Sequence, residues 1–547
     1  MFIAYNLLIT VKFSGRRRVC FLPQARGILV DPVLRRLNQQ QVELIHRLSL
    51  EILEEPGLMV FNQEAVDLLG TAGAKVEPIA EGFAFPAWRV HISEKLVNRA
   101  LESAPRRVRL GARDADNILE LDAGQPRVYF GSGSETNVWL EIEPEVFVAK
   151  GDPGREITYP TIARRRGTVA DLARAAHLAE QLDNLDFFLR PVNIQDDDIG
   201  GDNKDVNKFF ACLNYTTKHV MAGLTSLGQL GNVIKMAEII AGGPEELRKN
   251  PIISFITCVV KSPLQLVDDT TQKMLEMVRR GIPVVISSSP QGGSTAPIEE
   301  AGMVAQINAE ILAGIVLSQL ARPGAPVLYG SVPVRARMDN LHDMYGVPEF
   351  GHYNVDCVQM ARFYGLPCYS TAGVGDARIP GIQATVEKML TYGYVTPSGP
   401  ALIHYAFGLL EETQTFCPEQ AILDNWQIGI VKELWRQPEV TEEAGAQVLD
   451  TVRRVMASSH RLYARYTRQL VHKGKVFPTY PFASQGLADE ALLRAHEQLD
   501  AYLARSPRCL SREVCHEIFA RVPGILPRLN PYGKESVLPA TGPEVRS

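Results

Sequence analysis

The sequence lacks the short motifs that identify most hydrolases, zinc enzymes and nucleotide-binding proteins. It contains no C-x-x-C pair, no H-E-x-x-H, no phosphate-binding G-x-x-x-x-G-K-[ST] and no nucleophile elbow with an ordered Ser, Asp and His. Gly131-Ser132-Gly133 supplies a G-x-G, but the third glycine and the following helical pattern of a dinucleotide-binding fingerprint are missing. These absences weaken the case for a zinc enzyme or a hydrolase.

Charge and cysteine content argue against a nucleic-acid-binding protein and against a disulfide-bonded one. The net charge is −5, and the arginine runs at 16–18 and 164–166 are short, so we expect solvated surface and no nucleic-acid partner. The eight cysteines are scattered, which is typical of a reduced, cytoplasmic protein without disulfides. Cys509 and the pair Cys515-His516 lack a second ligand pair, so we interpret them as structural thiols and predict no metal site.

Two apolar segments resemble membrane segments only superficially. Met1–Phe13 is apolar, but its arginines follow it, the reverse of a secretory signal, and it is too short to span a bilayer. The longer stretch at 302–320 is interrupted by the polar residues Gln306, Asn308, Glu310 and Gln319. We therefore expect a buried helix there and no membrane partner.

Eight short apolar runs of β type recur through the middle of the chain, separated by helical patterns. Eight βα units predict a (β/α)8 TIM barrel, in which the chemistry lies where the strands end. The runs are Val128–Phe130, Phe187–Leu189, His219–Leu224, Ile252–Thr257, Ile282–Ser287, Pro326–Gly330, Leu366–Ser370 and Ala401–Tyr405.

The remaining patterns divide the chain into five regions. We expect a ragged extension over 1–35, a mainly helical region over 36–125, the barrel over 126–437, a second helical region over 438–520 and a tail over 521–547. A long insertion over about 139–167, with a β-type run at Val146–Ala149, follows the first barrel strand, and Val448–Val471 and Ala488–Leu503 are expected as helices. The fold class is thus α/β with helical extensions at both ends.

Small and hydroxylated residues follow several of the expected strands. Gly131 lies just after the first strand and Ser289 just after the fifth. Glycine lets a backbone approach a ligand closely, but it also permits a tight turn between strand and helix. The residue types alone leave both interpretations open.

Aromatic residues gather on the late strand ends and the loops that follow them. Aromatic faces attract quaternary ammonium groups by about 0.5–2 kcal/mol per contact, although a single tyrosine is more often core. Glu349 and Asp376 are candidate carboxylates beside them. The aromatic set is Tyr329, Tyr345, Phe350, His352, Tyr353, Tyr369 and Tyr405.

The segment from Gly351 to Asp424 resembles the trimethylamine methyltransferase family. The likeness rests on Met360–Tyr364, Pro367–Arg378 with Gln383, and Leu402–Glu411, supported by Phe130–Ser134 and Val347–Glu349. It extends over about 40–515 and implies a (β/α)8 barrel. It also implies methyl transfer from a methylated amine to the cobalt of a corrinoid held by a separate small protein.

The resemblance departs from the family at one informative loop. Archaeal members carry pyrrolysine in an Ala-Gly-x-Ser-Asp loop, which here reads Ala372-Gly373-Val374-Gly375-Asp376. Val374 then occupies the pyrrolysine position and Gly375 replaces the usual serine. Valine forms no adduct with an amine, and a quaternary ammonium needs none, so the resemblance favours glycine betaine or a similar substrate over trimethylamine.

The hypothesis of a methyltransferase assigns expected roles to residues at and after the strand ends. Glu349, His352 and Asp376 are the expected catalytic residues; the expected substrate-binding residues are Tyr329, Phe350, Tyr353, Tyr369, Ser289 and Gly131. The segment 339–346 reads D-x-x-H-x-x-x-G, which differs from the D-x-H-x-x-G of corrinoid carriers. We therefore expect no cofactor on this chain and a corrinoid supplied by the partner protein.

Three alternatives stay open at this stage. One is a trimethylamine:corrinoid methyltransferase. Another is a barrel lyase or hydrolase that needs no corrinoid, and the third is a betaine-binding protein without catalysis. Homo-oligomers are common among such barrels, but the sequence shows no definite interface.

Overall fold

The computed structural model describes residues 26–80, 82–148, 156–438, 440–459, 462–484 and 490–540. These residues fall into two compact units: a large one formed by 26–437 together with 484–540, and a small one formed by 438–483. Residues 1–25 of the expected extension lie outside the described residues. Residues 26–35 are not ragged, because β1 (Ile28–Leu29) pairs antiparallel with β7.

A curled sheet of nine strands forms the centre of the large unit. Its order is β1-β7-β21-β20-β17-β15-β12-β11-β10, and every neighbouring pair except β1–β7 is parallel. One parallel bridge, between Gly131 and Phe187, joins the β7 side to β10. The parallel strands are β7 (Arg127–Phe130), β10 (Phe187–Leu189), β11 (His219–Ala222), β12 (Ile253–Cys258), β15 (Val284–Ser288), β17 (Val327–Ser331), β20 (Cys368–Thr371) and β21 (Leu402–His404).

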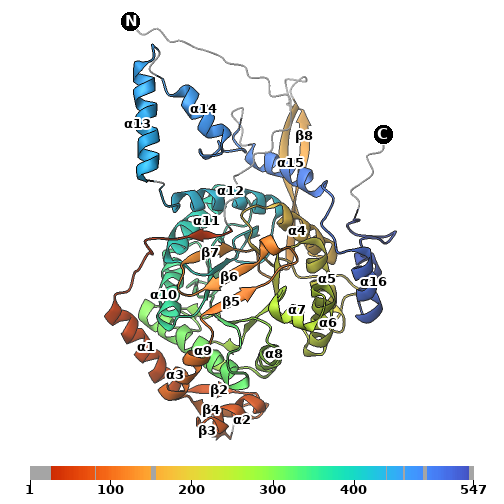
Figure 1. The fold of residues 1–547 in the computed structure, drawn as a ribbon. Coiled ribbons are helices and arrows are strands. Elements are labelled where there is room, and N and C mark those ends of the chain that lie inside the picture. The colour runs from red at the N-terminus through yellow and green to blue at the C-terminus, as the bar shows by residue number, and fades with distance from the viewer. Residues whose placement is uncertain are drawn as a thin grey trace. The chain divides into compact units, whose positions relative to one another are not determined.

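Each of these parallel strands overlaps one of the eight predicted runs, so the predicted α/β class is confirmed. Helices alternate with the strands along the chain and surround them in space (Figure 1). They are α4 (Val169–Gln181), α5 (Lys204–Tyr215), α6 (Leu230–Ala241), α7 (Pro244–Lys249), α8 (Asp268–Arg279), α9 (Glu300–Ala321), α10 (Pro348–Tyr364), α11 (Ile382–Val395) and α12 (Pro418–Leu434).

Local sequence signals explain where these helices begin and end. Thr168 and Asp171 form a reciprocal capping box at the start of α4. Proline opens α10, and Gly365 closes it at φ 67°, a conformation that costs glycine little. The helices are therefore delimited by side chains that satisfy their terminal backbone groups.

The N-terminal region contains the predicted helices and also short strands that were not predicted. Ala87–His91 pairs antiparallel with Lys75–Ile79 as part of a small sheet. The helices are α1 (Gln39–Glu54), α2 (Gln63–Thr71) and α3 (Glu94–Ser103); the small sheet contains β2 (Leu58–Val60), β3 (Lys75–Ile79), β4 (Ala87–His91), β13 (Val260–Lys261) and β14 (Gln265–Leu266).

A hairpin of β5 (Arg107–Leu110) and β6 (Leu119–Asp122) covers the amino ends of the parallel strands. Its inner residues Val108, Leu110, Leu119 and Leu121 pack in one core cluster with residues of the parallel strands that include Tyr129 and Phe187. Next to it, His219 Nδ1 at the start of β11 lies 2.7 Å from the carbonyl of Gly111. One end of the curled sheet is therefore closed by apolar packing.

The predicted insertion after β7 is a long antiparallel hairpin, β8 (Val138–Val148) with β9 (Glu156–Arg166). Ala149 lies outside the described residues. Short strands beside the carboxyl ends are β16 (Gln291–Gly292), β18 (Val334–Ala336), β19 (Asp343–Met344), β22 (Leu409–Leu410) and β23 (Thr415–Phe416).

The C-terminal part divides between the two units. α13 (Glu442–Ala457) and α14 (Ala464–His472) lie in the small unit, so the predicted helix Val448–Val471 is two helices. α15 (Ala491–Leu503) packs against α12 and α4 in the large unit, and α16 (Arg512–Arg521) packs against α6. Within residues 484–540 the expected helical region is thus part of the large unit.

Helix α9 is long and apolar enough to cross a membrane by length and composition. Its most apolar window is 89% buried inside the protein, however, where it packs against α1, α3, α8 and α10. The predicted buried helix at 302–320 is confirmed.

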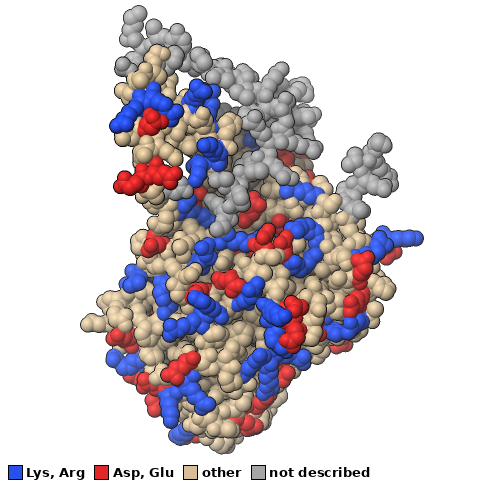
Figure 2. Space-filling view, viewed as in Figure 1, with Lys and Arg blue, Asp and Glu red and all other residues tan. Residues whose placement is uncertain are grey.

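Figure 2 shows acidic and basic side chains interspersed over the visible face of the molecule.

Gly131 offers a test of how the ends of the sheet meet. A Cβ at this position would lie 2.2 Å from the ring of Phe187, so we expect Gly131→Ala to lower the unfolding free energy by about 1–3 kcal/mol through overpacking. Urea unfolding followed by fluorescence measures the change. Gly231 in α6 has open space around it, and Gly231→Ala should be neutral or slightly stabilising; equal effects of both substitutions would contradict the close approach of β7 and β10.

Candidate site at the carboxyl ends of the strands

Solvent reaches the carboxyl ends of the parallel strands. Cys258, the last residue of the central strand β12, is exposed, and Ile256 and Tyr405 are half-buried. Surrounding protein nevertheless raises the pKa of the Cys258 thiol, mainly by burial. The thiol therefore faces an accessible but enclosed space, in contrast to the closed amino end of the sheet.

Aromatic rings line this region in a continuous series. Tyr369 stacks on His404 at 4.0 Å between ring centroids, and His404 contacts Tyr405 edge-on at 3.9 Å. Tyr345 lies 6.4 Å from Tyr405 and 5.3 Å from Phe350. We call Cys258, Tyr345, Tyr369, His404 and Tyr405 the strand-end site.

The rings of the strand-end site are electrically neutral. Burial raises the pKa values of Tyr345, Tyr369 and Tyr405 above the usual phenol range. Burial also lowers the pKa of His404 to about 3, and its Nδ1 lies 2.7 Å from the carbonyl of Ser370, so Nδ1 carries the proton and donates. The Tyr369 hydroxyl is buried, and no described residue bonds to it. Neutral aromatic faces of this kind attract organic cations.

Of the aromatic residues predicted to bind substrate, Phe350 and Tyr369 lie in this region. Tyr329 lies on the outer face of β17, where its hydroxyl donates to Asn308 Oδ1 of α9 at 2.9 Å. The Tyr353 hydroxyl donates to the carbonyl of Ile298 at 2.5 Å, and its ring packs with Ala296 and Met303. Both tyrosines therefore point away from the strand-end site, because strand and helix periodicity directs them toward α9.

Glu349 and His352 lie at the start of α10, half-buried. His352 Nδ1 is 2.8 Å from Glu300 Oε1, and the ring contacts Tyr394. Glu349 Oε1 is 3.9 Å from the guanidinium of Arg335. Both side chains therefore have interaction partners within the protein. Their part in catalysis stays a prediction.

Asp376 organises the loop after β20. Its carboxylate accepts hydrogen bonds from the backbone N–H groups of Tyr345 (2.7 Å) and Gly346 (3.1 Å). Burial raises its pKa, while these two donors lower it. Asp376 thus holds Tyr345 at the strand-end site through the backbone.

Helix α11 holds the same loop from behind. Lys388 Nζ donates to the carbonyl of Gly373 at 2.6 Å, and the N–H of Gly373 donates to Thr391 Oγ1 at 2.9 Å. Glu387 Oε2 accepts from the N–H groups of Asp376 and Ala377. Val374, between these anchors, is fully buried.

Gly375 has a steric reason to be glycine. A Cβ there would lie 2.3 Å from Glu387 Oε2. The serine found at this place in the Ala-Gly-x-Ser-Asp pattern would displace the carboxylate that anchors the loop. Glycine at position 375 therefore leaves the space that the Glu387 carboxylate occupies.

The two remaining predicted contacts have structural explanations. Gly131 allows the ring of Phe187 to lie against β7, as its missing Cβ shows. Ser289 is exposed, and its hydroxyl donates to the carbonyl of Val332 at 3.0 Å. Of the two interpretations left open for Gly131, the structure supports close packing.

Sequence reasoning missed several residues of the strand-end site. Tyr345 and Tyr405 stood in the aromatic set without an assigned role, and Cys258 and His404 were assigned none. Their position in the sequence could have identified all of them except Tyr345, because Cys258 and His404 end parallel strands and Tyr405 follows one. Tyr405 also has a φ of 67°, which is uncommon for a bulky residue.

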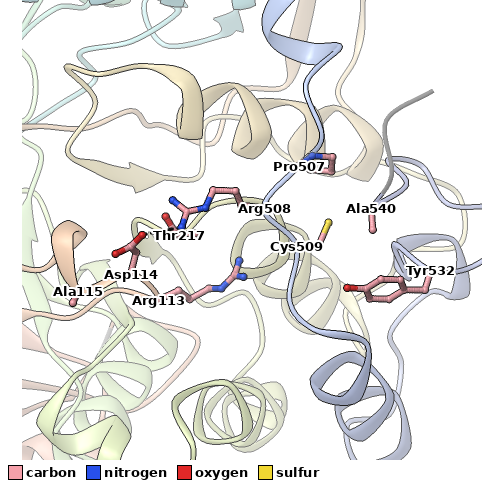
Figure 3. A pocket seen from close by; sticks show the side chains of 9 residues that line it. All are labelled: Arg113, Asp114, Ala115, Thr217, Pro507, Arg508, Cys509, Tyr532 and Ala540. Carbon is pink, nitrogen blue, oxygen red and sulfur yellow. Dashed lines mark hydrogen bonds and ion pairs between the residues drawn. The ribbon is translucent and has the colours of Figure 1, made fainter. Parts of the chain in front are cut away.

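A second depression, of about 490 Å³, lies beside Thr217, which precedes β11, near the amino ends of the strands (Figure 3). Arg113 Nη1 donates to the carbonyls of Leu213, Asn214 and Thr216. Arg508 pairs with Asp114 and Glu180. The guanidinium groups are thus committed to structural contacts. Among the residues that the structure describes, no group of three or more His, Cys, Asp or Glu is arranged to hold a metal ion.

Comparison with known proteins identifies the family. The family model of the trimethylamine methyltransferases (MTTB) matches residues 21–473. A trimethylamine methyltransferase MttB of Desulfitobacterium hafniense is 34% identical over 407 residues, which are 74% of this chain and 76% of that protein. The chain belongs to this family.

The names of further relatives contain two different substrates. A Methanosarcina barkeri protein named trimethylamine methyltransferase MttB is 31% identical over 85% of this chain and 89% of its own length. A glycine betaine methyltransferase of Desulfitobacterium hafniense is 26% identical over 79% of this chain and 84% of its own length. A solved structure of a hydroxylamine complex of MtmB is 12% identical, covers 86% of this chain and 89% of its own, and has a TM-score of 0.45. The chain is accordingly a methyltransferase.

The anchor of the loop that contains Val374 can be tested through Lys388. Lys388 and Asp424 form a fully buried ion pair at 3.1 Å, and Asp424 also accepts from the N–H of Gly408 at 2.7 Å. We expect Lys388→Met to lower the unfolding free energy by about 3–5 kcal/mol, because it leaves a buried carboxylate unpaired. Urea unfolding measures this loss.

The double variant Lys388→Met/Asp424→Asn provides the control for that experiment. Asparagine at 424 removes the unpaired charge and can still accept from Gly408. We expect the double variant to recover at least half of the lost stability. A double variant no more stable than the single one would show that the loss does not arise from the unpaired charge.

Proposed function

We propose that this chain transfers a methyl group from a quaternary amine, glycine betaine or a close analogue, to the Co(I) corrinoid of a small partner protein. The observation that carries the proposal is the loop after β20. At the position of pyrrolysine it holds Val374, a buried aliphatic side chain that cannot bond covalently to an amine. A permanently charged quaternary ammonium needs no such bond, since its leaving group is already a neutral tertiary amine.

The neutral rings of the strand-end site support this substrate class. Tyr345, Tyr369 and Tyr405 come from three separate segments and form one series of ring contacts through His404, in which Tyr405 is half-buried and the other two tyrosines are buried. Such rings bind a trimethylammonium group through their faces, by about 0.5–2 kcal/mol per contact. An amine that must lose a proton before reacting would benefit from a nearby base, whereas burial lowers the pKa of His404 to about 3 and makes it a weak base.

The residues of the chain would act by position and by exclusion of water. The rings hold the ammonium group so that one N-methyl carbon faces the open side of the site, where the acceptor protein approaches. Asp376, Glu387 and Lys388 keep the intervening loop and Tyr345 in place. Fixing the methyl carbon in line with the incoming nucleophile supplies much of the rate in such transfers. The corrinoid supplies the nucleophilic metal that takes the methyl group.

The architecture is consistent with this division of labour. We take the curled parallel sheet as a (β/α)8 barrel whose catalytic domain spans 126–437, with its carboxyl end open to a corrinoid protein. Glu349 and His352 remain candidates for orienting the far end of the substrate from α10. A chain of this type would work in the cytoplasm, where the reduced corrinoid persists.

A trimethylamine substrate is the second candidate, favoured by one observation. The family relatives that are 30–34% identical carry that substrate in their names, whereas the glycine betaine enzyme is 26% identical. Identity summed over the chain weighs less than the residue at the reacting position, and Val374 is the reason to prefer a quaternary amine.

The proposed reaction can be followed directly. We expect methyl transfer when the chain is mixed anaerobically with its reduced corrinoid protein and glycine betaine, seen as the absorbance change of methyl-cobalt formation. Trimethylamine under the same conditions should give less than a tenth of that rate. A faster reaction with trimethylamine, or none with any of a panel of quaternary amines, would overturn the proposal, as would turnover without the corrinoid protein.

The ring cluster gives a prediction at single-residue level. We expect Tyr405→Leu to lower kcat/KM for the quaternary amine at least about tenfold, because leucine is apolar but lacks the π face. Tyr159 on the β8–β9 hairpin is 40% exposed, and Tyr159→Leu is the matched control, expected to leave kcat/KM unchanged. The same loss in both variants would indicate a general effect on the fold.

A further inference from the structure

Glu310 is exceptional among the buried carboxylates of the described residues. Each of the other fully buried ones has a cationic partner. The pairs are Asp171–Arg165, Asp186–Lys432, Asp205–Lys208, Asp356–Arg36, Glu419–His496 and Asp424–Lys388. In the part of the chain that the structure describes, Glu310 alone of this buried set has no lysine, arginine or histidine within ion-pair distance.

Neutral donors surround the Glu310 carboxylate instead. Oε2 accepts from the hydroxyl of Ser262 at 2.7 Å and from the hydroxyl of Ser288. Oε1 accepts from the N–H of Leu264 at 3.0 Å and from the amide of Gln306 at 3.0 Å. This arrangement satisfies the lone pairs of an ionised carboxylate but leaves its charge uncompensated, which is costly in a buried place.

The position of Glu310 relates this charge to the strand-end site. Ser288 is the last residue of β15 and faces α9, where it meets Glu310, while the preceding Ser287 lies 3.3 Å from the Cys258 thiol. Glu310 therefore lies one strand layer behind Cys258. The two groups are electrostatically coupled, since the carboxylate contributes to the raised pKa of Cys258.

We propose that the missing cation is the substrate itself, so that Glu310 supplies the counter-charge for the quaternary ammonium group bound at the strand-end site. This inference rests on the proposed function and adds a positioning residue that touches neither the reacting carbon nor the acceptor. A quaternary ammonium cannot lose its charge, so a site that removes it from water needs a negative charge nearby.

Other carboxylates near the carboxyl ends differ from Glu310 in their partners or exposure. Asp343 is half-buried and accepts from the Tyr345 hydroxyl at 3.3 Å and from the Gln291 amide at 2.6 Å. Asp205 is paired with Lys208, and Glu135 with Arg190. Asp376 is occupied by two backbone donors and lies among other acids on the far loop. Burial raises the pKa of Glu310 and its four donors oppose that rise, so binding is best measured at pH 8, where ionisation is favoured.

The test compares ligands that differ only in charge. Glycine betaine and 3,3-dimethylbutanoate have the same shape and carboxylate, but carbon replaces nitrogen in the second. Tetramethylammonium serves as a cation without a carboxylate. Each is titrated by calorimetry into the full chain at pH 8, as wild type, Glu310→Gln and Glu310→Asp.

We expect Glu310→Gln to weaken binding of both cations at least about tenfold and to leave the affinity for 3,3-dimethylbutanoate within about twofold of wild type. Glu310→Asp keeps the charge and should retain most of the preference for glycine betaine. Glu180→Gln is the matched control: Glu180 of α4 is a half-buried glutamate that accepts from two threonine hydroxyls and a backbone N–H just before β11, at the opposite end of the strands, and it pairs with Arg508. It should change no ligand preference.

Two outcomes would overturn the assignment of Glu310. One is an equal loss for the cations and for 3,3-dimethylbutanoate, and the other is no loss for either. Thermal unfolding of each variant shows whether a substitution destabilises the fold. If Glu310→Gln does not fold, loss of the cation preference in a folded Glu310→Asp variant would overturn the proposed role of Glu310. Titrations of the wild-type protein test the proposed function separately. If the wild type binds tetramethylammonium but not glycine betaine, betaine is rejected as the substrate and the role of Glu310 is still tested. If it binds neither cation, both proposals are rejected.

Discussion

The alternation of side chains along the parallel strands is the constraint on which the rest of this structure depends. Tyr369 of β20 faces the interior of the sheet and stacks on His404, whereas the next residue, Ser370, faces α10 and bonds to Asn354. On β15, Ser287 contacts Cys258 and Ser288 contacts Glu310 of α9. A single residue step thus separates the lining of the site from the layer that supports it.

The supporting layer is built from buried charges as much as from apolar packing. Lys388 and Asp424 fix the loop that contains Val374, and Asp205 with Lys208 lies beside the end of β11. Such pairs are expensive to desolvate and are poor sources of stability, but a broken pair costs more than it contributed. Because a broken pair is costly, these ion pairs hold the loops in a single conformation. A fixed conformation suits a site that works by holding a methyl carbon in place.

The proposed chemistry makes few demands on reactive side chains. A methyl group leaving a permanently charged nitrogen needs no general acid, because the departing amine is neutral. The rings of Tyr345, Tyr369 and Tyr405 and the charge of Glu310 would bind the cation, while the nucleophile belongs to another protein. This explains why the motifs of hydrolases and zinc enzymes are absent from an enzyme of this size.

Periodicity and turn residues in the sequence determined the eight parallel strands, the helices between them and, through the resemblance, the family, because these depend on local pattern and on motif order. Which aromatic residues share one space was decided only by tertiary structure: Tyr329 and Tyr353 point to α9, and Tyr405 and His404 complete the site. The N-terminal strands were missed because short alternating runs pair with distant segments such as β14. Glu310 looked like an ordinary polar residue of a buried helix; only the fold, by placing serines instead of a cation beside it, left its charge without a partner.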